Sequence, residues 1–427
     1  MLNTPVLFSL ILSFIVFFVS GCRNQEQNNE SSHSGILTIV VMGPYSCEFA
    51  KYISIYNDEN PNITLNIIEH NHDNIDNENH EDNEENHYHE IYERFRTGEI
   101  QADLIIMSTS SIASFLNDGI IADLSLFESV KPHIDNPNIF DEVIRLCMYD
   151  DRIAGIPLNI FYSGLAINEE LFAKVETAPP TAGWSYDDYY ELALIVNEYN
   201  KTAATRVYML LPSRTAENYA AVTRGFDLKN NYKPLFNTAE FVDYLRKAKA
   251  VDDMGLYYYP DHIAFSSFED AINAKYGDNL LFHEIIYADL HNYSSVKFID
   301  KNIIPAPTIM GQQPYADAVL LCLSANPINS KIAESFIAGF LSEEYQYKNA
   351  FEMQIYRDVN KYDILSTYSP QTIEWIRTVT ETYCALILPL DVWDWINSIA
   401  LPQGKADTIN FEQFTEDLQA GALMYLD

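Results

Sequence analysis

Short apolar runs alternate with amphipathic stretches along most of the chain, and this alternation predicts its secondary structure. Continuous apolar runs predict strands in ILTIVVM (36–42), ITLNIIE (63–69) and ADLIIM (102–107). Apolar residues at helical spacing predict helices in CEFAKYISIYNDENP, HEIYERFRTGEI and SSIASFLNDGIIADL, the last ending at 117–119. Strands that alternate with helices of this length predict βαβ units, a mostly parallel sheet and therefore an α/β fold.

The second half of the chain continues the alternation. Further strands are predicted in RIAGIPLNIFYSGLAIN, RVYMLLPS, IIPAPTI and DAVLLCLSA. Long helices are predicted in SYDDYYELALIVNEYNK, in TAEFVDYLRKAKAVDDMG and, as a single helix, in SKIAESFIAGFLSEEYQYKNAF. Residues 369–427 are predicted to be mostly helical.

The first residues, MLNTPVLFSLILSFIVFFVSGC, hold an uncharged apolar run of 14 residues, from Val6 to Val19. A membrane-spanning helix needs about 20 residues, so the run favours a signal peptide over residues 1–21. Small residues directly before Cys22 resemble the lipobox of bacterial lipoproteins, in which the cysteine is acylated, as with palmitate, and becomes the new N-terminus. A plain secretory signal is the alternative. The polar residues 22–35 predict a flexible tether.

Composition indicates a large globular body, with 48% hydrophobic and 13% aromatic residues in a chain of 427. The part beyond the tether is too long for one ordinary core and predicts two lobes. A net charge of −35 argues against nucleic-acid binding. Four widely spaced cysteines lack metal-binding spacing, and we expect buried free thiols, with disulfide pairing left open. They are Cys47, Cys147, Cys322 and Cys384.

The segment EHNHDNIDNENHEDNEENHYHE (69–90) interrupts the pattern, because it is rich in acidic residues, Asn and His and has no Lys or Arg. Such filler favours a solvated, disordered loop. Its histidines give an alternative, a site for Zn²⁺, Ni²⁺ or Cu²⁺ in a metal-binding or metal-sensing surface lipoprotein. These candidate ligands are His70, His72, His80, His87 and His89.

Several segments, taken in order, resemble the extracellular solute-binding proteins, family 1, of ABC importers. The resemblance is carried by ADLIIMSTSSIASFLNDGIIADLS, GIPLNIFYSGLAINEELFAKV, RGFDLKNNYKPLFNTAEFVDYLRKAKAVDDMGL, IIPAPTIMGQQPYADAVLLCLSANPINSKIAESFIAGFLSEEYQ and FEQFTEDLQAGALMYLD. In one departure, Ala271 stands in FEDAINAKYGDNLLFHEI where the family often has Gly.

The resemblance implies a two-lobed periplasmic-binding-protein-like fold, in which each lobe is a mostly parallel sheet flanked by helices and hinge strands join the lobes. It implies a first lobe over 36–160 with a return over 305–350, a second lobe over 161–304, and C-terminal helices over 351–427, mainly in the second lobe. It also implies the partners: a small solute, expected to be a carbohydrate, an ABC permease, and the membrane through the lipid anchor, on the extracellular face. We expect a monomer that needs no cofactor.

Ligands of open parallel sheets sit beyond the carboxyl ends of the strands. That rule selects hydroxyls in GPYSCE and STSS, although Ser108 and Ser110 also fit helix capping. Strand alternation places Asn159 and Phe161 on one face and Tyr162 on the other, with core packing as the alternative. Arg214 fits a ligand contact or a surface ion pair. The full candidate set is Tyr45, Ser46, Ser108, Thr109, Ser110, Asn159, Phe161, Tyr162, Ser213, Arg214, Tyr287, Tyr315 and Asp317.

No catalytic motif is present: the sequence has no GxSxG, HExxH or P-loop pattern. We therefore expect a binding protein and not an enzyme. A secreted glycoside-acting enzyme with two carboxylates is the second alternative. Trp184 is expected to pack in a core, while Trp393 and Trp395, two positions apart, do not share a helix face.

Overall fold

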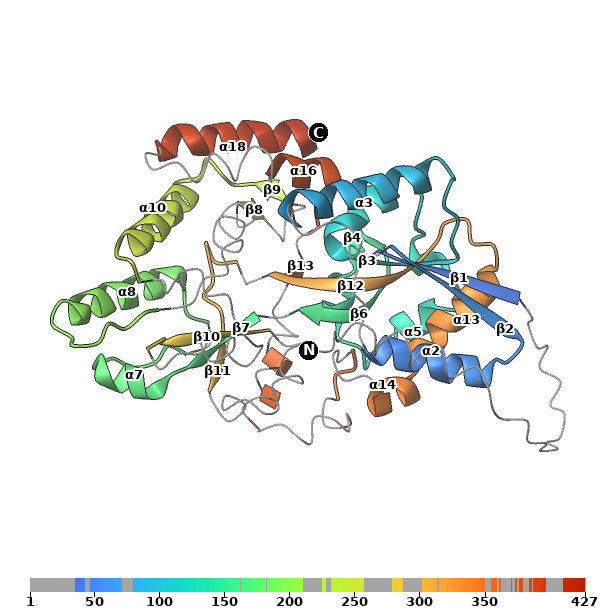
Figure 1. Ribbon diagram of the computed structural model, residues 1–427, viewed down its shortest axis with the longest axis horizontal. Coiled ribbons are helices and arrows are strands. Elements are labelled where there is room, and N and C mark those ends of the chain that lie inside the picture. The colour runs from blue at the N-terminus through green and yellow to red at the C-terminus, as the bar shows by residue number, and fades with distance from the viewer. Residues whose placement is uncertain are drawn as a thin grey trace, which may run out of the picture. The chain divides into compact units, whose positions relative to one another are not determined.

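The computed structural model of the chain (Figure 1) describes residues 35–42, 47–70, 80–161, 163–181, 183–209, 225–227, 232–256, 279–286, 302–312, 315–349, 355–358, 361, 370, 373–374, 376–378, 384–385, 387–396 and 410–426. No helix in these ranges is long and apolar enough to cross a membrane. The predictions for residues 1–21, for Cys22 and for the tether up to residue 34 lie outside them.

The first sheet combines a parallel half with an antiparallel strand. Its strands are β1 (Gly35–Val41), β2 (Ile63–Glu69), β3 (Leu104–Ser108), β6 (Ile156–Phe161), β12 (Tyr315–Leu323) and β13 (Cys384–Ala385). β1 pairs in parallel with β2 and β3, whereas β12 runs antiparallel to both β3 and β6. The sequence predicted the mostly parallel arrangement and the boundaries of β2. Continuous apolar runs such as that of β1 suit strands buried on both faces.

Helices cover this sheet and complete the first core, a cluster of buried apolar residues from β1, β3, β6, β12 and the neighbouring helices. The helical segments on this side are α2 (Cys47–Glu59), α3 (His80–Arg96), η2 (Thr109–Ser111), α4 (Ile112–Asn117), η3 (Leu124–Leu126), α5 (Lys131–Ile134), α6 (Asp141–Arg145), α13 (Ser330–Phe340) and α14 (Glu343–Asn349). A short hairpin, β4 (Met148–Tyr149) and β5 (Arg152–Ile153), precedes β6.

The single helix predicted over 330–351 is wrong, because α13 ends at Phe340 and α14 begins at Glu343. Ser342 lies between them, and its Oγ accepts a hydrogen bond from the backbone N–H of Tyr345 at 3.2 Å. A hydroxyl in this position caps the start of a helix, so it favours a new helix over continuation of the old one.

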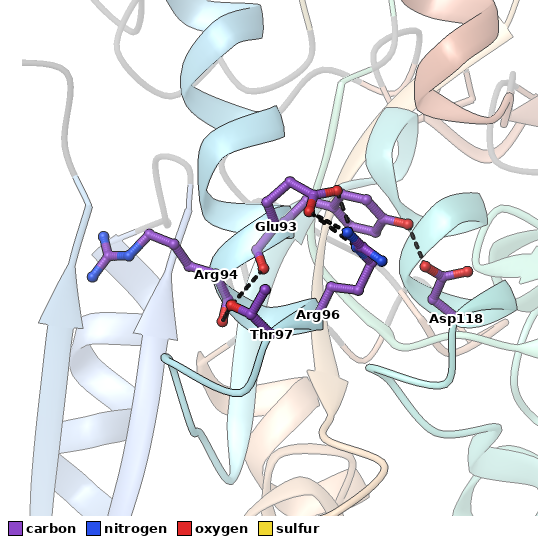
Figure 2. A network of polar contacts seen from close by, with 6 residues as sticks. Glu93, Arg94, Arg96, Thr97 and Asp118 are labelled. Atoms are coloured by element: carbon purple, nitrogen blue, oxygen red, sulfur yellow. Dashed lines mark hydrogen bonds and ion pairs between the residues drawn. The ribbon is translucent and has the colours of Figure 1, made fainter.

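The acidic, histidine-rich segment is in part helical, which corrects the prediction of a loop throughout 69–90. α3 begins at His80, and its last turns are held by polar contacts (Figure 2). The Arg96 guanidinium donates to the Glu93 carboxylate, with Nη2 and Oε2 2.7 Å apart, and the Tyr92 hydroxyl donates to Asp118. Asp118 caps the C-terminal end of α4, so this network ties α3 to α4.

The second sheet has the order β10 (Phe282–Ile286), β7 (Ser163–Ile167), β11 (Ile303–Pro305). Its three strands pair antiparallel, which departs from the parallel sheet predicted for this lobe. Tyr208 adds a parallel bridge to Leu280, so only part of the predicted strand at 206–213 is seen. α7 (Glu169–Lys174) and α8 (Tyr186–Asn200) pack on this sheet and form the second core.

Trp184 is a core residue, as predicted, because it is 6% exposed and its Nε1 donates to the carbonyl of Pro305 at 2.9 Å. A third core joins α10 (Ala239–Asp253), α16 (Leu390–Trp395) and α18 (Phe411–Leu426) with the hairpin of β8 (Phe226–Asp227) and β9 (Lys233–Pro234). Trp395 is buried in this core, so it is not an exposed ring for a ligand.

Within the described strands, the chain crosses between the two sheets at two places. The first crossing is abrupt, since β6 ends at Phe161 and β7 begins at Ser163. The second lies between β11 and β12, where Ile303 packs in the first core, Ile304 in the second and Ile309 in the third. From Ala316 onward, the buried residues of β12 pack in the first core. Ile355 also packs in the first core, although 351–427 was assigned mainly to the second lobe.

Asp103, directly before β3, ties together three segments of the first lobe. Its buried carboxylate accepts from the backbone N–H of Thr38 in β1 at 2.8 Å and from that of Asn329, before α13, at 2.7 Å. Its own carbonyl accepts from the N–H of Ser324, which follows β12. A carboxylate with two backbone donors satisfies groups that would otherwise be buried without partners.

We expect Asp103→Ala to lower the free energy of unfolding by about 2–6 kcal/mol, because two N–H groups lose their acceptor and each costs about 1–3 kcal/mol. Urea unfolding followed by circular dichroism measures the change. Asp103→Asn is the matched control, since its amide oxygen keeps one acceptor and should lose about half as much. Equal losses in the two variants would show that the hydrogen bonds are not the cause.

Candidate functional site

The carboxyl ends of β3 and β6 and the amino end of β12 meet at one edge of the first sheet. β12 lies between the other two strands and runs against both, so its first residues stand beside their last ones. Asp317 is opposite Phe161, and Val319 lies between Ser108 on one side and Asn159 on the other. This edge therefore collects five of the predicted site residues, with Thr109 directly following Ser108.

The register decides which of these side chains share a face. Residues directly opposite in an antiparallel pair point to the same side of a sheet. Ser108, Asn159, Phe161 and Asp317 therefore lie on one face, because the register shift in this pair comes only after the pairing of Val319 with Asn159. Exposure on this face rises toward the end of the sheet, from buried Asn159 to exposed Asp317.

Asp317 is the centre of a small hydrogen-bond network. Its Oδ1 accepts from the Ser108 hydroxyl at 3.1 Å, from the Thr109 hydroxyl, and from the backbone N–H of Ala318 at 2.8 Å. Ser108 also caps η2, since its Oγ accepts from the N–H of Ser110 at 3.3 Å. The sequence left capping and ligand contact open for Ser108, and capping is confirmed.

Desolvation raises the pKa of the Asp317 carboxyl above its usual range, and the hydrogen bonds from Thr109, Ala318 and Ser108 oppose that rise. The residue still reaches solvent, so protein surrounds the carboxylate closely while one side stays accessible. Within the described part of the chain, Asp317 forms no ion pair with a basic side chain. A carboxylate placed in this way is an acceptor that can bind hydroxyl groups.

Asn159 adds a second acceptor to the same face. The residue is 7% exposed, and its Oδ1 has no hydrogen-bond partner among the described residues. A buried polar atom without a partner costs free energy, and a hydrogen bond from a ligand would offset that cost. Diagonal neighbours on antiparallel strands are about 7–8 Å apart, which places Asn159 within reach of a molecule that also contacts Asp317.

Phe161 supplies an apolar surface beside these acceptors. The ring is half-buried, packs against the first core, and lies opposite Asp317 in the register. Sequence reasoning left core packing and ligand contact open for this residue, and its partial exposure keeps both roles available. An aromatic ring next to hydrogen-bond acceptors is the combination that binds the apolar face and the hydroxyls of a sugar.

Ser110 also lies here, since its hydroxyl donates to the Ser108 Oγ at 3.0 Å. For the other predicted residues the structure places no side chain at this edge. Only the backbone of Tyr315, the first residue of β12, is described. The remaining candidates, Tyr45, Ser46, Tyr162, Ser213, Arg214 and Tyr287, lie outside the described residues. The same holds for His72, and for the side chains of His80 and His87, in the metal alternative. In the described residues, no group of three His, Cys, Asp or Glu could hold a metal ion.

Sequence reasoning selected the residues of the network but missed their bonds to one another. The hydroxyls of Ser108 and Thr109 come from β3 and η2, about two hundred residues before Asp317, and nothing local in the sequence indicates that they meet. The backbone N–H of Ala318, which also donates to the carboxylate, was not predicted. Any residue can supply such a donor, so no sequence signal could have identified it.

Several solved structures with the same fold are solute-binding proteins. The ABC substrate-binding protein Lmo0181 from Listeria monocytogenes, in complex with cycloalternan, aligns with a TM-score of 0.67 and 15% identity over 92% of this chain and 99% of that chain. The GacH receptor of Streptomyces glaucescens, solved unliganded and with acarbose, aligns with a TM-score of 0.66 and 12% identity over 92% of this chain and 99% of that chain. The extracellular solute-binding protein from Staphylococcus aureus, in complex with maltose, aligns with a TM-score of 0.61 and 14% identity over 94% of this chain and 98% of that chain.

The chain therefore has the fold of the two-lobed solute-binding proteins, and the predicted fold class is confirmed. The likeness extends over nearly all of each compared chain. No protein-family model matches the sequence, and no curated protein matches it. At 12–15% identity the likeness establishes the fold, and the function has to be argued from the site.

We expect Asp317→Asn to unfold at a higher temperature than the unmodified protein at pH 7. The folded protein holds the pKa of this carboxyl above its unfolded value, so ionisation favours the unfolded chain. The penalty is absent below the unfolded pKa, grows as the pH rises toward the folded pKa, and is constant above it.

Melting temperatures of the two proteins between pH 7 and about pH 4, close to the usual pKa of Asp, check this expectation. The difference in melting temperature between the variant and the unmodified protein should become smaller as the pH falls. A variant that is less stable at pH 7 would mean that the bonds from Thr109 and Ala318 outweigh the desolvation of the carboxylate.

Proposed function

We propose that this protein is the solute-binding component of an ABC importer, and that it binds a carbohydrate between its two lobes. The observation that carries the proposal is the set of acceptors and an aromatic ring at one sheet edge: Asp317, Asn159 and Phe161, with the hydroxyls of Ser108 and Thr109. The edge lies where β6 passes into β7 of the second sheet, so a ligand there is within reach of both lobes.

The fold supports the choice of ligand class. Among the structures that share it, the proteins from Listeria, Streptomyces and Staphylococcus were solved with cycloalternan, acarbose and maltose. Neutral polyols present many hydroxyl donors and have an apolar ring face, which match the acceptors and the ring at this site. A binding protein needs no cofactor and no turnover, and we propose neither for this chain.

Hinge closure is the proposed mechanism. Each sheet carries most of one core, and the chain passes from Phe161 in the first sheet to Ser163 in the second and returns between β11 and β12. Few backbone torsions then need to change when the lobes move as rigid bodies. A ligand that contacts both lobes favours the closed form by its difference in affinity for the two forms, and the permease would accept the closed form.

The anchoring and location follow from the first residues. We propose that the signal peptide over 1–21 is removed, that Cys22 carries the lipid, and that residues 22–35 tether the protein to the outer face of the cell membrane as a monomer. Acylation by two or more chains holds a protein firmly at a membrane, whereas one chain holds it only marginally. The metal alternative has no observation in its favour among the described residues.

A thermal-shift screen against maltose, cycloalternan, acarbose and other neutral sugars tests the binding function. A ligand present at a hundred times its Kd stabilises the folded protein by about 2.7 kcal/mol, which is a readily measured shift in melting temperature. Phe161→Leu should weaken the binding of any hit about two- to tenfold, because aromatic stacking contributes about 0.5–1.5 kcal/mol.

Phe95→Leu is the matched control, because Phe95 is also a partly buried ring on the first core but packs against Phe115 where α3 contacts α4. It should leave the affinity unchanged. Small-angle scattering of the protein with a hit should show compaction. The absence of any sugar that stabilises the protein would contradict the proposed function, and a hit that is hydrolysed would point to the enzyme alternative.

A further inference from the structure

Among the described residues, no positively charged side chain pairs with the acceptors of the proposed sugar site. Asp317 receives hydrogen bonds only from hydroxyls and from a backbone N–H, and within the described part of the chain no Lys, Arg or His lies in ion-pair distance of it. The only causes of its pKa shift are desolvation and these hydrogen bonds, so no charged side chain in the described ranges neutralises it. Among the described residues, no charged side chain therefore offsets the negative charge that this carboxylate presents to a ligand.

Asn159 presents a second acceptor on the same face. Its Oδ1 is buried without a partner among the described residues, and the residue lies one diagonal step from Asp317 across the β6–β12 pair. Both atoms need a donor from the ligand, and neither can donate to one: an ionised carboxylate has no proton, and the amide oxygen has none. The site is thus specified by two acceptors, one charged and one neutral.

We propose that this pair selects the ligand by charge: the site takes sugars that present hydroxyl or ammonium groups to Asp317 and Asn159, and it excludes sugars that present a carboxylate or a phosphate there. The inference rests on the proposed function and names the class of sugar within it. A uronic acid or a sugar phosphate would bring a second anion against a carboxylate that protein surrounds on most sides, and no cation among the described residues would separate the two charges.

Loss of the donor adds to this repulsion. A site built to accept a hydrogen bond from the ligand discriminates strongly against an analogue that lacks the donor, because the buried acceptors are then left without partners. We therefore expect a uronic acid to bind at least about 100-fold more weakly than the matching neutral sugar, and an amino sugar to bind at least as tightly as the neutral one.

Matched monosaccharide sets test the inference on the whole protein: glucose, glucosamine and glucuronic acid, and galactose, galactosamine and galacturonic acid. Binding is measured at pH 7 by calorimetry and thermal shift, with each sugar titrated to the same high concentration. In a set that binds, we expect the amino sugar to have an affinity at least equal to that of the neutral sugar. The affinity of the uronic acid should be far below both.

Asp317→Asn removes the charge and keeps the shape. We expect this variant to bind the neutral sugar with about tenfold lower affinity, because a charge-assisted hydrogen bond becomes a neutral one. The ratio of the affinities for the neutral and the acidic sugar should fall to about tenfold or less. Asn159→Ala should also lower the affinity for the neutral sugar by about tenfold. It should still not bind the acidic sugar, because the charge of Asp317 remains.

Asp252→Asn is the control for net charge. Asp252 is exposed in α10, so this variant changes the total charge by the same single unit as Asp317→Asn but leaves the site untouched. It should keep the full discrimination of the unmodified protein. Melting curves and circular dichroism confirm that each variant is folded before its affinities are compared.

The outcomes separate the inference from the function on which it rests. Neutral and acidic sugars that bind equally well to the unmodified protein would overturn the charge selection and leave sugar binding intact. Discrimination that survives in Asp317→Asn, or disappears in Asp252→Asn, would also overturn it. If no member of either set binds and the thermal-shift screen finds no sugar, the proposed function fails, and the inference fails with it.

Discussion

The antiparallel insertion of β12 is the constraint on which the arrangement of the first lobe depends. This strand returns from the second lobe and enters the first sheet between β3 and β6, where its register is fixed on both sides. A slip by one residue would turn Asp317 into the core and an apolar neighbour outward. Because Val319 and the residues after it are buried on both faces, such a slip is strongly disfavoured, and the position of the carboxylate follows from the packing of the strand.

The same strand accounts for the separation of the two lobes. β11 belongs to the second sheet and β12 to the first, so the chain that follows β11 is one of two direct connections near the site. Asp103 secures the far end of this arrangement, where it joins β1, the residues after β12 and the start of α13. The first lobe is therefore fastened at both ends of β12, while the passage from β6 to β7 takes a single residue. This combination suits rigid lobes that move about a short hinge.

Local patterns predicted the elements of the fold better than their pairing. Apolar runs and helical spacing predicted β1, β2, α2, α8 and α10 nearly to the residue, because burial dictates those patterns directly. The antiparallel pairing of β7 with its neighbours was missed, since a continuous apolar run reads the same in either orientation. The break at Ser342 was also missed, because one capping hydroxyl outweighed an otherwise helical pattern. At the site, the general rule for the carboxyl ends of strands selected Ser108 and Thr109, whereas their bonds to Asp317 depend on a register between distant strands that no local pattern indicates.

The two thiols in the first core have a consequence for the chemistry of the protein. Cys147 and Cys322 are free and fully buried, and burial raises the pKa of both thiols well above the usual range. Thiolates, not thiols, attack disulfides and alkylating reagents, so both sulfurs are inert while the core is closed. Modification of either one would then report each opening of the first lobe, which makes these cysteines intrinsic reporters of its local unfolding and leaves the second lobe silent in the same measurement.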